Sequence, residues 1–489
     1  MFTGETMIFP DLIYTGEMPA VTLDPIVFED MKLNSMIRED ITEVMGRLCG
    51  GEDIAARQAV FAALDEGDVI DYFEGLARIA AKMADLDEAY REARCDEERQ
   101  YIFLHLIRSV CDFVHAAAGG KDESDSLFAR RFIGAFREYA ADKLFCELDR
   151  RSASVLEDMT DVTKNSFIIE GEHLKVVRTC EDTLSERIRR CAADLGIAQL
   201  PEKKPVERRL TVDTVKAIAG LYPAQAGALS ELYESYHKVY DADICKYRVQ
   251  LDFYLQIKAL MKKIASYGIP VRYPRLTEEK KIEIRSAYDV TLLTKQNGGI
   301  IPNDISFSKE EPFFYLTGAN GGGKTTYLRT VGNAVLLALC GCPVPCEDAE
   351  LYPMKRLYTH FPRDERFDNT GRFVDEEMRI AKITADADDE SLVLLNETYS
   401  TTNEETATRL TAELADKLHS AGVFGIYITH QHGLDSGKIP YLNVVIDTDD
   451  GNRRTYKVAR RKESAGSFAR DILVKYRLTA EQLKARFGI

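Results

Sequence analysis

The sequence lacks the features that mark membrane, secreted and repeat proteins. No run of consecutive apolar residues reaches the length of about 18 that a membrane span needs, and residues 1–6 show neither the basic region nor the apolar core of a secretory signal. No internal repeat of fixed period and no low-complexity tract occurs. We therefore expect a cytoplasmic protein that neither spans the membrane nor has a membrane partner.

Positive charge is also in short supply. The 489 residues include 64 Lys and Arg against 80 Asp and Glu, which gives a formal net charge of −16. An acidic chain is a poor general binder of polyanions, so any contact with nucleic acid must use a local basic surface. The segment from Lys203 to Arg209 is the preferred candidate because it lies in an expected loop. The paired basic residues are Arg150-Arg151, Lys203-Lys204, Arg208-Arg209, Lys262-Lys263 and Lys280-Lys281.

Cysteine is present but lacks the pattern of a disulfide framework. The ten cysteines are scattered between Cys49 and Cys346 without dense, regular spacing, so reduced thiols are expected. A metal site at Cys340, Cys342 and Cys346 is disfavoured because two prolines interrupt the cluster and no CxxC pair or nearby histidine accompanies it. We interpret these three residues as small apolar packing residues.

The chain changes character near residues 267–270. Between about Leu33 and Lys263 the apolar residues recur at helical spacing, whereas short apolar runs of strand type follow it. We therefore predict an N-terminal segment (1–30), a mostly helical domain (31–266) and an α/β domain with a largely parallel sheet (267–489). The expected elements of the α/β domain are strands 313–316, 392–395 and 423–428, helices 325–339 and 404–420, and a hairpin of 442–447 with 455–459.

The most specific pattern is a glycine-rich segment that matches G-x-x-x-x-G-K-[ST] between an expected strand and an expected helix. Glycines let backbone N–H groups turn toward phosphate oxygens, and the helix N-terminus adds its dipole. Lys324 supplies a charge for the β- and γ-phosphates, and Thr325 offers a hydroxyl to Mg²⁺. We therefore predict a site for ATP and Mg²⁺ at Gly318, Ala319, Asn320, Gly321, Gly322, Gly323, Lys324, Thr325 and Thr326.

Polar residues follow the next two expected strands. Asn396 and Glu397 end the apolar run 391–395, where one residue is expected to hold the Mg²⁺ shell and the other to orient the attacking water. Asn396 takes the first role without adding Coulomb attraction, and Glu397 takes the second. His430 follows the strand 423–428 and is a candidate sensor of the γ-phosphate. A polar turn at Asn396 and a packing role for His430 are the alternative interpretations.

Two further groups near this edge have plainer interpretations. His432 is expected to lie outside the site. Thr402 and Glu405 have the spacing of a capping box, so Thr401 and Thr402 are interpreted as helix caps.

At this point the residues resemble the ATPase domain of the MutS family of DNA mismatch-repair and recombination proteins. The resemblance covers about residue 303 to the C-terminus, and the helical half is similar only in type to the family's lever and clamp region. The segments that carry it are Pro302-Asn-Asp-Ile305, Thr317-Gly-Ala-Asn-Gly-Gly-Gly-Lys-Thr-Thr-Tyr-Leu-Arg329, Gly371-Arg-Phe-Val-Asp-Glu-Glu377, Leu394-Leu-Asn-Glu-Thr-Tyr-Ser-Thr-Thr402 and Ile428-Thr-His-Gln-His432.

The resemblance implies an α/β P-loop NTPase, with an ABC-like ATPase domain at the C-terminus and a mostly α-helical lever or clamp-like region before it. In that family two ATPase domains meet around ATP, which implies a homodimer or higher oligomer with ATP-gated clamp opening on DNA. Lys324 and Thr325 carry over as ligands of phosphate and Mg²⁺. Glu397 carries over as the residue that activates water, and His430 as the switch histidine.

The sequence also departs from the family pattern. Asn396 replaces the family's metal-binding aspartate, and Thr370 is the only hydroxyl near the segment that completes a partner's site in that family. The roughly thirty residues before the first expected helix are too few for a mismatch-reading domain. Phe136-Arg-Glu138 and Phe145-Cys-Glu147 match the family's Phe-x-Glu wedge but fall in helical sequence, so we expect no mismatch reading.

Two classes of function remain open. The first is a DNA-dependent ATPase that gates a dimeric clamp on branched, recombining or otherwise non-B DNA, in repair or recombination. The second is a slow nucleotide-dependent switch that grips a protein or RNA partner, with hydrolysis slowed by Asn396. An ATPase of the structural-maintenance-of-chromosomes type is disfavoured because no LSGGQ-like signature lies between Lys324 and Asn396.

Overall fold

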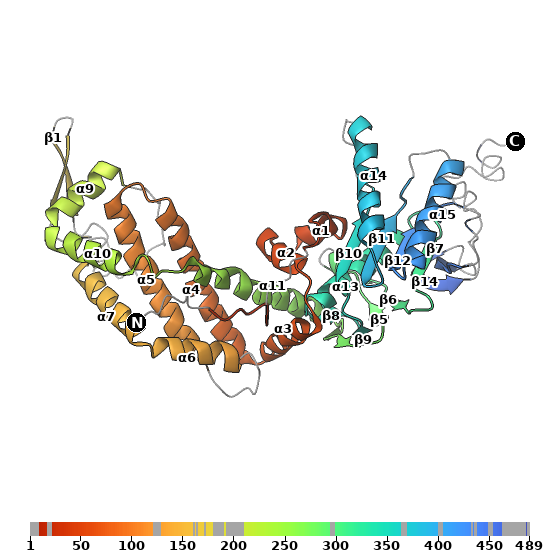
Figure 1. Cartoon of the computed structure of the whole chain (residues 1–489), viewed down its shortest axis with the longest axis horizontal. Helices are drawn as coiled ribbons and strands as arrows, with labels where there is room; N and C mark the ends of the chain where they lie inside the picture. The colour runs from red at the N-terminus through yellow and green to blue at the C-terminus, as the bar shows by residue number, and fades with distance from the viewer. Residues whose placement is uncertain are drawn as a thin grey trace. The chain divides into compact units, whose positions relative to one another are not determined.

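The chain forms two compact units (Figure 1). The helical unit comprises Met1–Asp11 and Gly67–Leu251, and the sheet unit comprises Leu12–Glu66 and Asp252–Ile489. The computed structural model describes residues 9–16, 22–120, 129–159, 162, 165–170, 173–178, 190–191, 210–293, 299–362, 369–399, 404–431, 434, 438–447, 453–461 and 486.

This division differs from the predicted one, in which boundaries fall at residues 30/31 and 266/267. The segment Leu12–Glu66 groups with the C-terminal part because its side chains are buried there. The Arg57 side chain is fully buried, and its guanidinium donates hydrogen bonds to the carbonyl oxygens of Ile13 (2.9 Å) and Cys340 (3.2 Å). A buried cation is costly without partners, so both bonds stabilise the buried Arg57. The bond to Cys340 links the N-terminal helices to the C-terminal part of the sheet unit.

The helical unit is mostly α-helical, as expected. Helix α7 begins at Lys143 because the Asp142 carboxylate accepts hydrogen bonds from the backbone N–H groups of Leu144 (2.8 Å) and Phe145 (3.2 Å). Its elements are α4 (Gly67–Arg91), α5 (Asp96–Ala118), a π-helical turn (Ala129–Ile133), α6 (Gly134–Ala140), α7 (Lys143–Asp158), β1 (Asn165–Glu170), β2 (His173–Arg178), α9 (Val212–Leu221), α10 (Pro223–Tyr236) and a 3₁₀ turn (Ala242–Lys246).

The hairpin of β1 and β2 is a strand pair, which was not predicted, in a half that was predicted to be mostly helical. The two strands pair in antiparallel register, with Asn165 opposite Arg178 and Glu170 opposite His173. Ile168-Ile169 and Val176-Val177 are pairs of β-branched residues, whose restricted side chains favour strand over helix. This local preference outweighs the helical spacing of the surrounding sequence.

An aromatic cluster fills the centre of the helical unit. The rings of Phe136 and Phe113 meet edge to face, with their centroids 5.6 Å apart. The ring of Tyr247 stacks on that of Phe113, with their centroids 5.1 Å apart. Helix α5 is the one described helix that is long and apolar enough to cross a membrane, but more than half of its apolar window is buried in the protein. Phe103, Leu104 and other α5 side chains are fully buried, so packing accounts for the apolar character of this helix.

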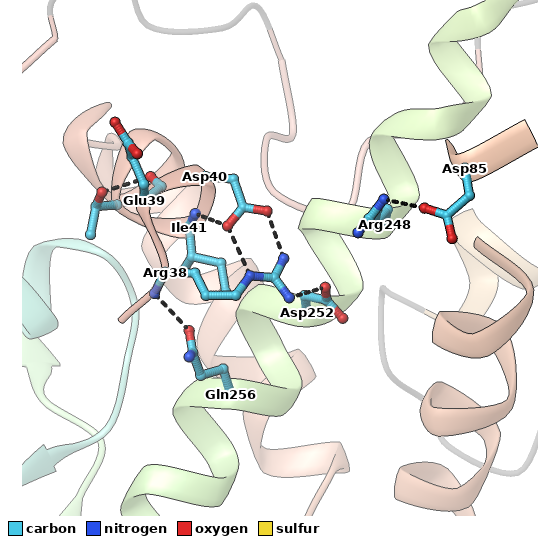
Figure 2. A network of polar contacts seen from close by, with 9 residues as sticks. Arg38, Glu39, Asp40, Ile41, Asp85, Arg248, Asp252 and Gln256 are labelled. Atoms are coloured by element: carbon cyan, nitrogen blue, oxygen red, sulfur yellow. Dashed lines mark hydrogen bonds and ion pairs between the residues drawn. The ribbon is translucent and has the colours of Figure 1, made fainter. Parts of the chain in front are cut away.

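The N-terminal helices of the sheet unit pack with the C-terminal part of α11 (Tyr247–Ala265). Figure 2 shows the Arg38 guanidinium held between the carboxylates of Asp40 (2.6 Å) and Asp252 (2.7 Å). The backbone N–H of Arg38 also donates to the side chain of Gln256 (3.4 Å). These helices are α1 (Ile26–Asp30), a 3₁₀ turn (Leu33–Ser35), α2 (Glu39–Gly46) and α3 (Gly51–Ala63).

A six-stranded sheet carries most of the sheet unit, with strand order β10-β11-β12-β7-β13-β14. Adjacent strands pair in parallel from β10 to β13, and β14 is antiparallel to β13. This confirms the predicted largely parallel sheet and its terminal hairpin. The elements are β7 (Phe313–Thr317), α13 (Lys324–Leu339), β10 (Arg356–His360), α14 (Asn369–Asp386), β11 (Ser391–Asn396), α15 (Glu404–Ser420), β12 (Phe424–Ile428), β13 (Tyr441–Asp447) and β14 (Arg453–Arg461).

A second, four-stranded sheet has the order β4-β9-β5-β6, and β3 pairs separately with β8. Sequence reasoning placed strand-type segments after residue 267 without assigning these. Their bounds, with a short helix, are β3 (Val271–Arg272), β4 (Arg275–Leu276), β5 (Ile282–Ala287), α12 (Val290–Leu293), β6 (Asn303–Phe307), β8 (Val344–Pro345) and β9 (Asp348–Leu351).

Helices cover both faces of the six-stranded sheet. Side chains of α14 and α15 form one core with Tyr315, Val393 and Leu395 of the sheet. Leu394 alternates with its neighbours and faces α13, where a Cβ placed on Gly332 would lie 2.9 Å from the Leu394 side chain. The glycine-rich loop connects the carboxyl end of the central strand β7 to the first residue of α13. Helix α13 packs on one face of the sheet.

Candidate nucleotide-binding site

The loop between β7 and α13 has a backbone that requires glycine. Gly318, Gly321 and Gly323 have φ angles of +134°, +68° and +100°. Side chains other than hydrogen are strained in this region, so these positions need glycine. Gly322 donates its backbone N–H to the Ala319 carbonyl (3.0 Å) and closes a turn inside the loop. The predicted phosphate-loop motif thus forms a compact turn at the N-terminus of a sixteen-residue helix.

Lys324, the first residue of α13, points back into this loop. Its side chain is 5% exposed, and its Nζ donates to the Gly318 carbonyl (2.8 Å) and contacts the Asn320 side-chain oxygen (3.4 Å). Burial lowers the pKa of the Lys324 ammonium below its ordinary value, and the charge of Glu397 opposes that shift. A buried ammonium held only by neutral oxygens is well placed to exchange them for an anion. Thr325 and Thr326 follow on the same helical turn and are half-buried.

Asn396 ends strand β11 with an unsatisfied polar atom. The residue is 7% exposed, and its Oδ1 is buried without a hydrogen-bond partner. An unpaired buried oxygen costs about 1–3 kcal/mol, so packing alone gives no reason for it. Mg²⁺ binds oxygen ligands, and the waters bound to it donate hydrogen bonds to oxygen acceptors. The unpaired Oδ1 and the Thr325 hydroxyl therefore fit the predicted metal position in chemical type.

Glu397 and His430 contact each other across adjacent strands. Asn396 pairs with Ile428 in the parallel register of β11 and β12, which brings the residues after both strands together. The Glu397 Oε1 lies 2.8 Å from the His430 Nε2, and the Glu397 backbone N–H donates to the Ile428 carbonyl (3.0 Å). Glu397 adopts a φ of +51°, an uncommon conformation that this backbone bond supports.

The contact with His430 sets the ionisation of Glu397. A hydrogen bond with His430 is the main cause that holds the pKa of the Glu397 carboxyl below its ordinary value, against the opposing effect of burial. The positive charge of Lys324 acts in the same direction. The arrangement therefore presents an ionised, oriented carboxylate beside the glycine-rich loop. Sequence reasoning chose both residues but did not predict their contact.

A second histidine lies at the end of β10 and was not predicted. His360 is 2% exposed, its Nδ1 lies 3.2 Å from the Thr398 hydroxyl, and its Nε2 has no hydrogen-bond partner. Burial, with a smaller contribution from Arg379, lowers the pKa of His360 to about 4. The imidazole is therefore neutral near pH 7. His360 follows a short apolar run, as His430 does, and this position is its only signal in the sequence.

Two asparagines connect the strands that surround the glycine-rich loop. Thr317 donates from its hydroxyl to the Asn443 side-chain oxygen at 2.5 Å, which joins β7 to β13. Asn303 of β6 donates to the Tyr456 carbonyl (3.0 Å) and accepts from the Val458 N–H (2.8 Å). Asn303 belongs to a segment that carried the family resemblance, and the structure gives it a role in holding β14. Sequence reasoning had no signal for the pairing of Thr317 with Asn443.

The cysteine cluster is buried in the sheet unit. Cys340, Cys342 and Cys346 are fully buried, and burial raises the pKa of each thiol. Among the residues described by the structure, no group of three His, Cys, Asp or Glu side chains is arranged to hold a metal ion. Their burial fits the interpretation of these cysteines as packing residues, which stays a prediction.

Several predicted residues lie outside the described part of the chain. These are Lys203 to Arg209, Thr401, Thr402, His432 and residue 368, together with the side chain of Thr370. Of the other basic pairs, Arg151 forms an ion pair with Glu231, and Lys280 with Asp389. Phe136 and Phe145 are each 1% exposed in the helical core, so neither is available as a mismatch wedge.

Comparison with known proteins relates the glycine-rich loop and its surroundings to one family. Residues 314–488 match the family model described as MutS domain V. The match begins inside β7 and includes the loop, Asn396, Glu397 and His430. Residues 314–488 are therefore similar to MutS domain V, which supports a relationship to the MutS family.

Curated relatives point the same way. The chain is 32% identical over 168 residues to the DNA mismatch repair protein MutS of Methanosarcina mazei, covering 33% of this chain and 19% of that protein. It is 29% identical over 239 residues to endonuclease MutS2 of Bacillus cytotoxicus (48% and 27%). It is 30% identical over 196 residues to the DNA mismatch repair protein MSH2 of Saccharomyces cerevisiae (38% and 20%). The chain thus spans about a fifth to a quarter of the length of these relatives.

Proposed function

We propose that this protein is a DNA-dependent ATPase of MutS type, which binds and hydrolyses ATP with Mg²⁺ to gate its grip on DNA. The observation that carries the proposal is the juxtaposition of a phosphate loop containing the buried Lys324 with the polar strand ends at Asn396 and Glu397. The match to MutS domain V and the names of the curated relatives support the same reading.

Each residue has a defined part in this proposal. The loop from Gly318 to Gly323 offers backbone N–H groups to the phosphates, and Lys324 exchanges its carbonyl partners for phosphate oxygens. Glu397 accepts a proton from, or orients, the attacking water, and His430 fixes the direction of that carboxylate. Thr325 and Asn396 would hold Mg²⁺ as oxygen ligands, and the ion would neutralise negative charge on the phosphates.

The remaining attributes rest on the family relationship. The protein would be a homodimer, because two ATPase domains would meet around ATP. It would act in the cytoplasm. Its nucleic-acid target would be branched, recombining or otherwise non-B DNA in repair or recombination. The names of curated relatives refer to DNA mismatch repair and to an endonuclease. The burial of Phe136 and Phe145 supports a role without mismatch reading by either residue.

One observation favours a second function. Asn396 is neutral where an acidic residue would attract the cation, which supports slow turnover. A slowly hydrolysing protein would act as a nucleotide-dependent switch that grips a protein or RNA partner. The two functions differ in the response of hydrolysis to DNA.

The test is steady-state ATP hydrolysis by the purified protein with duplex, mismatched, branched and single-stranded DNA. Lys324→Ala serves as the blank, and Lys417→Ala, at an exposed lysine of α15 outside the basic pairs, serves as a matched control. We expect hydrolysis that disappears in Lys324→Ala, persists in Lys417→Ala and changes with one class of DNA. A rate of hydrolysis that no DNA changes would instead support the second function, a nucleotide-dependent switch that grips a protein or RNA partner. Hydrolysis retained in Lys324→Ala would contradict the proposed site.

A further inference from the structure

The hairpin of β13 and β14 is irregular where it faces the glycine-rich loop. Val444 pairs with Val458 and Ile446 with Arg454, so a two-residue step on β13 faces a four-residue step on β14. Within the longer step, Tyr456 takes a φ of +56°. Bulges of this kind re-aim side chains and are common beside functional sites. Here the irregular strand turns its side chains onto the loop.

Three residues of this hairpin lie against glycines of the loop. A Cβ placed on Gly318 would lie 3.1 Å from Val444, and one on Gly323 would lie 3.3 Å from the Tyr456 ring. A Cβ on Gly321 would lie 2.7 Å from the Arg454 guanidinium. The glycine-rich loop therefore packs closely against the hairpin, and Arg454 contacts the loop at Gly321.

Arg454 makes two hydrogen bonds to consecutive carbonyl groups of the loop. Its Nη2 donates to the Asn320 carbonyl (2.9 Å) and its Nη1 to the Gly321 carbonyl (3.1 Å). The planar guanidinium presents two N–H groups in a fixed fork, which suits two neighbouring oxygens. Lys324 contacts the same loop from the side of the Gly318 carbonyl. Two cations thus hold the loop at different points.

The geometry points to Arg454 as a positioning residue for nucleotide phosphates, which acts by fixing the peptide groups of the loop. In a trans peptide the C=O and the N–H point in opposite directions. Holding the Asn320 carbonyl toward Arg454 directs the Gly321 N–H to the opposite side of the loop. Holding the Gly321 carbonyl likewise directs the Gly322 N–H inward, where it donates to Ala319.

This arrangement favours binding of a triphosphate in two ways. Carbonyl oxygens, which would repel phosphate, are turned away, and the loop is held in shape before the ligand arrives, so less ordering remains to oppose binding. Arg454 does not need to touch the nucleotide itself. The inference rests on the proposed function, because it assigns a role to a residue that acts through the proposed ATP site.

The test compares equilibrium binding of ATP and of tripolyphosphate to the wild-type chain and to Arg454→Ala, Arg454→Lys and Arg460→Ala. Arg460 lies on the same strand and pairs with Glu311, so its removal changes the charge without touching the loop. We expect Arg454→Ala to weaken both ligands by the same factor, about 10-fold, with kcat at saturating ATP within twofold of wild type. Arg460→Ala should bind as wild type does.

Arg454→Lys separates orientation from charge, because lysine keeps the charge but has no planar fork. We expect it to remain at least fivefold weaker than wild type. Full recovery in this variant, or unchanged or tighter binding in Arg454→Ala, would overturn the inference. Failure of the wild-type chain to bind ATP, or binding retained in Lys324→Ala, would instead overturn the proposed function. Thermal melts of each variant without ligand establish that it is folded.

Discussion

The helical unit and the sheet unit differ in where they bury polar side chains. In the described part of the helical unit, the centre is filled by aromatic residues such as Phe113 and Phe136. The sheet unit buries Lys324, His360 and Asn396 near the ends of its strands, and polar atoms of the last two lack hydrogen-bond partners. Apolar burial stabilises a fold, whereas unpaired polar burial opposes it. The helical unit also holds unpaired polar atoms, such as His105 Nε2 and Ser109 Oγ on α5, but only the sheet unit places them at strand ends beside the glycine-rich loop among the described residues. This placement fits a site for a ligand in the sheet unit.

The largest effect that this contrast predicts is on chemistry rather than stability. Glu397→Gln should lower kcat for ATP hydrolysis by roughly 100- to 10,000-fold, because the amide cannot act as a base. The affinity for ATP should change little. Since the pKa of the Glu397 carboxyl lies below its ordinary value of 4.5, the carboxylate stays ionised as pH falls. Wild-type turnover should therefore show no loss from this group above about pH 4.5.

The measurement is steady-state kinetics from pH 8 downward, with ATP binding followed separately. Glu405→Gln, at an exposed glutamate of α15, is the matched control and should retain wild-type turnover. A Glu397→Gln variant that hydrolyses ATP at the wild-type rate would show that another group activates the water.

In the helical unit the same kind of truncation should affect stability. Phe136→Ala should reduce the free energy of unfolding of this unit by about 3–5 kcal/mol, because it removes a fully packed ring and leaves a cavity. Tyr101→Ala, on an aromatic residue that is 38% exposed, should cost much less. Urea unfolding followed by circular dichroism gives both values. Unchanged stability with a loss of mismatched-DNA binding would instead identify Phe136 as a wedge.

His360 should make the stability of the sheet unit depend on pH. Its pKa is lowered from 6.5 to about 4, so below pH 6.5 the unfolded chain takes up a proton that the folded chain excludes. Stability should fall as pH drops from about 6.5 to about 4 and then level off, by at most about 3 kcal/mol from this group. His360→Gln should flatten that fall, as measured by urea midpoints across the pH range. Equal flattening in His419→Gln would contradict the assignment to His360.

The smallest expected effect is at Asn396. Asn396→Asp should raise turnover a few-fold at saturating Mg²⁺, because the carboxylate adds Coulomb attraction to the cation. Without Mg²⁺ the same change should lower the melting temperature, because it buries a charge without a partner. Comparing melts with and without Mg²⁺ and ATP tests both statements. Unchanged or reduced turnover would mean that asparagine already suits the site.

Strands β7, β11 and β12 and helices α13 and α15 were predictable because each carries its own local pattern. Strand β10 and helix α14, which lie between them in the chain, were not predicted. The phosphate loop was predictable because glycine spacing reports backbone conformation directly. The contact of Glu397 with His430 and that of Arg454 with Gly321 were not predicted, since they join residues 33 and 133 positions apart. The grouping of Leu12–Glu66 with the C-terminal part was not predicted for the same reason. Burial of Arg57 beside Cys340 is a long-range fact with no local signature.

The sheet unit is assembled from two stretches of chain that are separated by the whole of Gly67–Leu251. During synthesis, Arg57 is made 283 residues before the Cys340 carbonyl that accepts its hydrogen bond. At roughly 5–20 residues per second, that interval is about 15–60 s. The helices α1 to α3 must wait for their binding surface while the intervening unit is already complete. The sheet unit, which carries the proposed nucleotide site, is therefore completed late in synthesis.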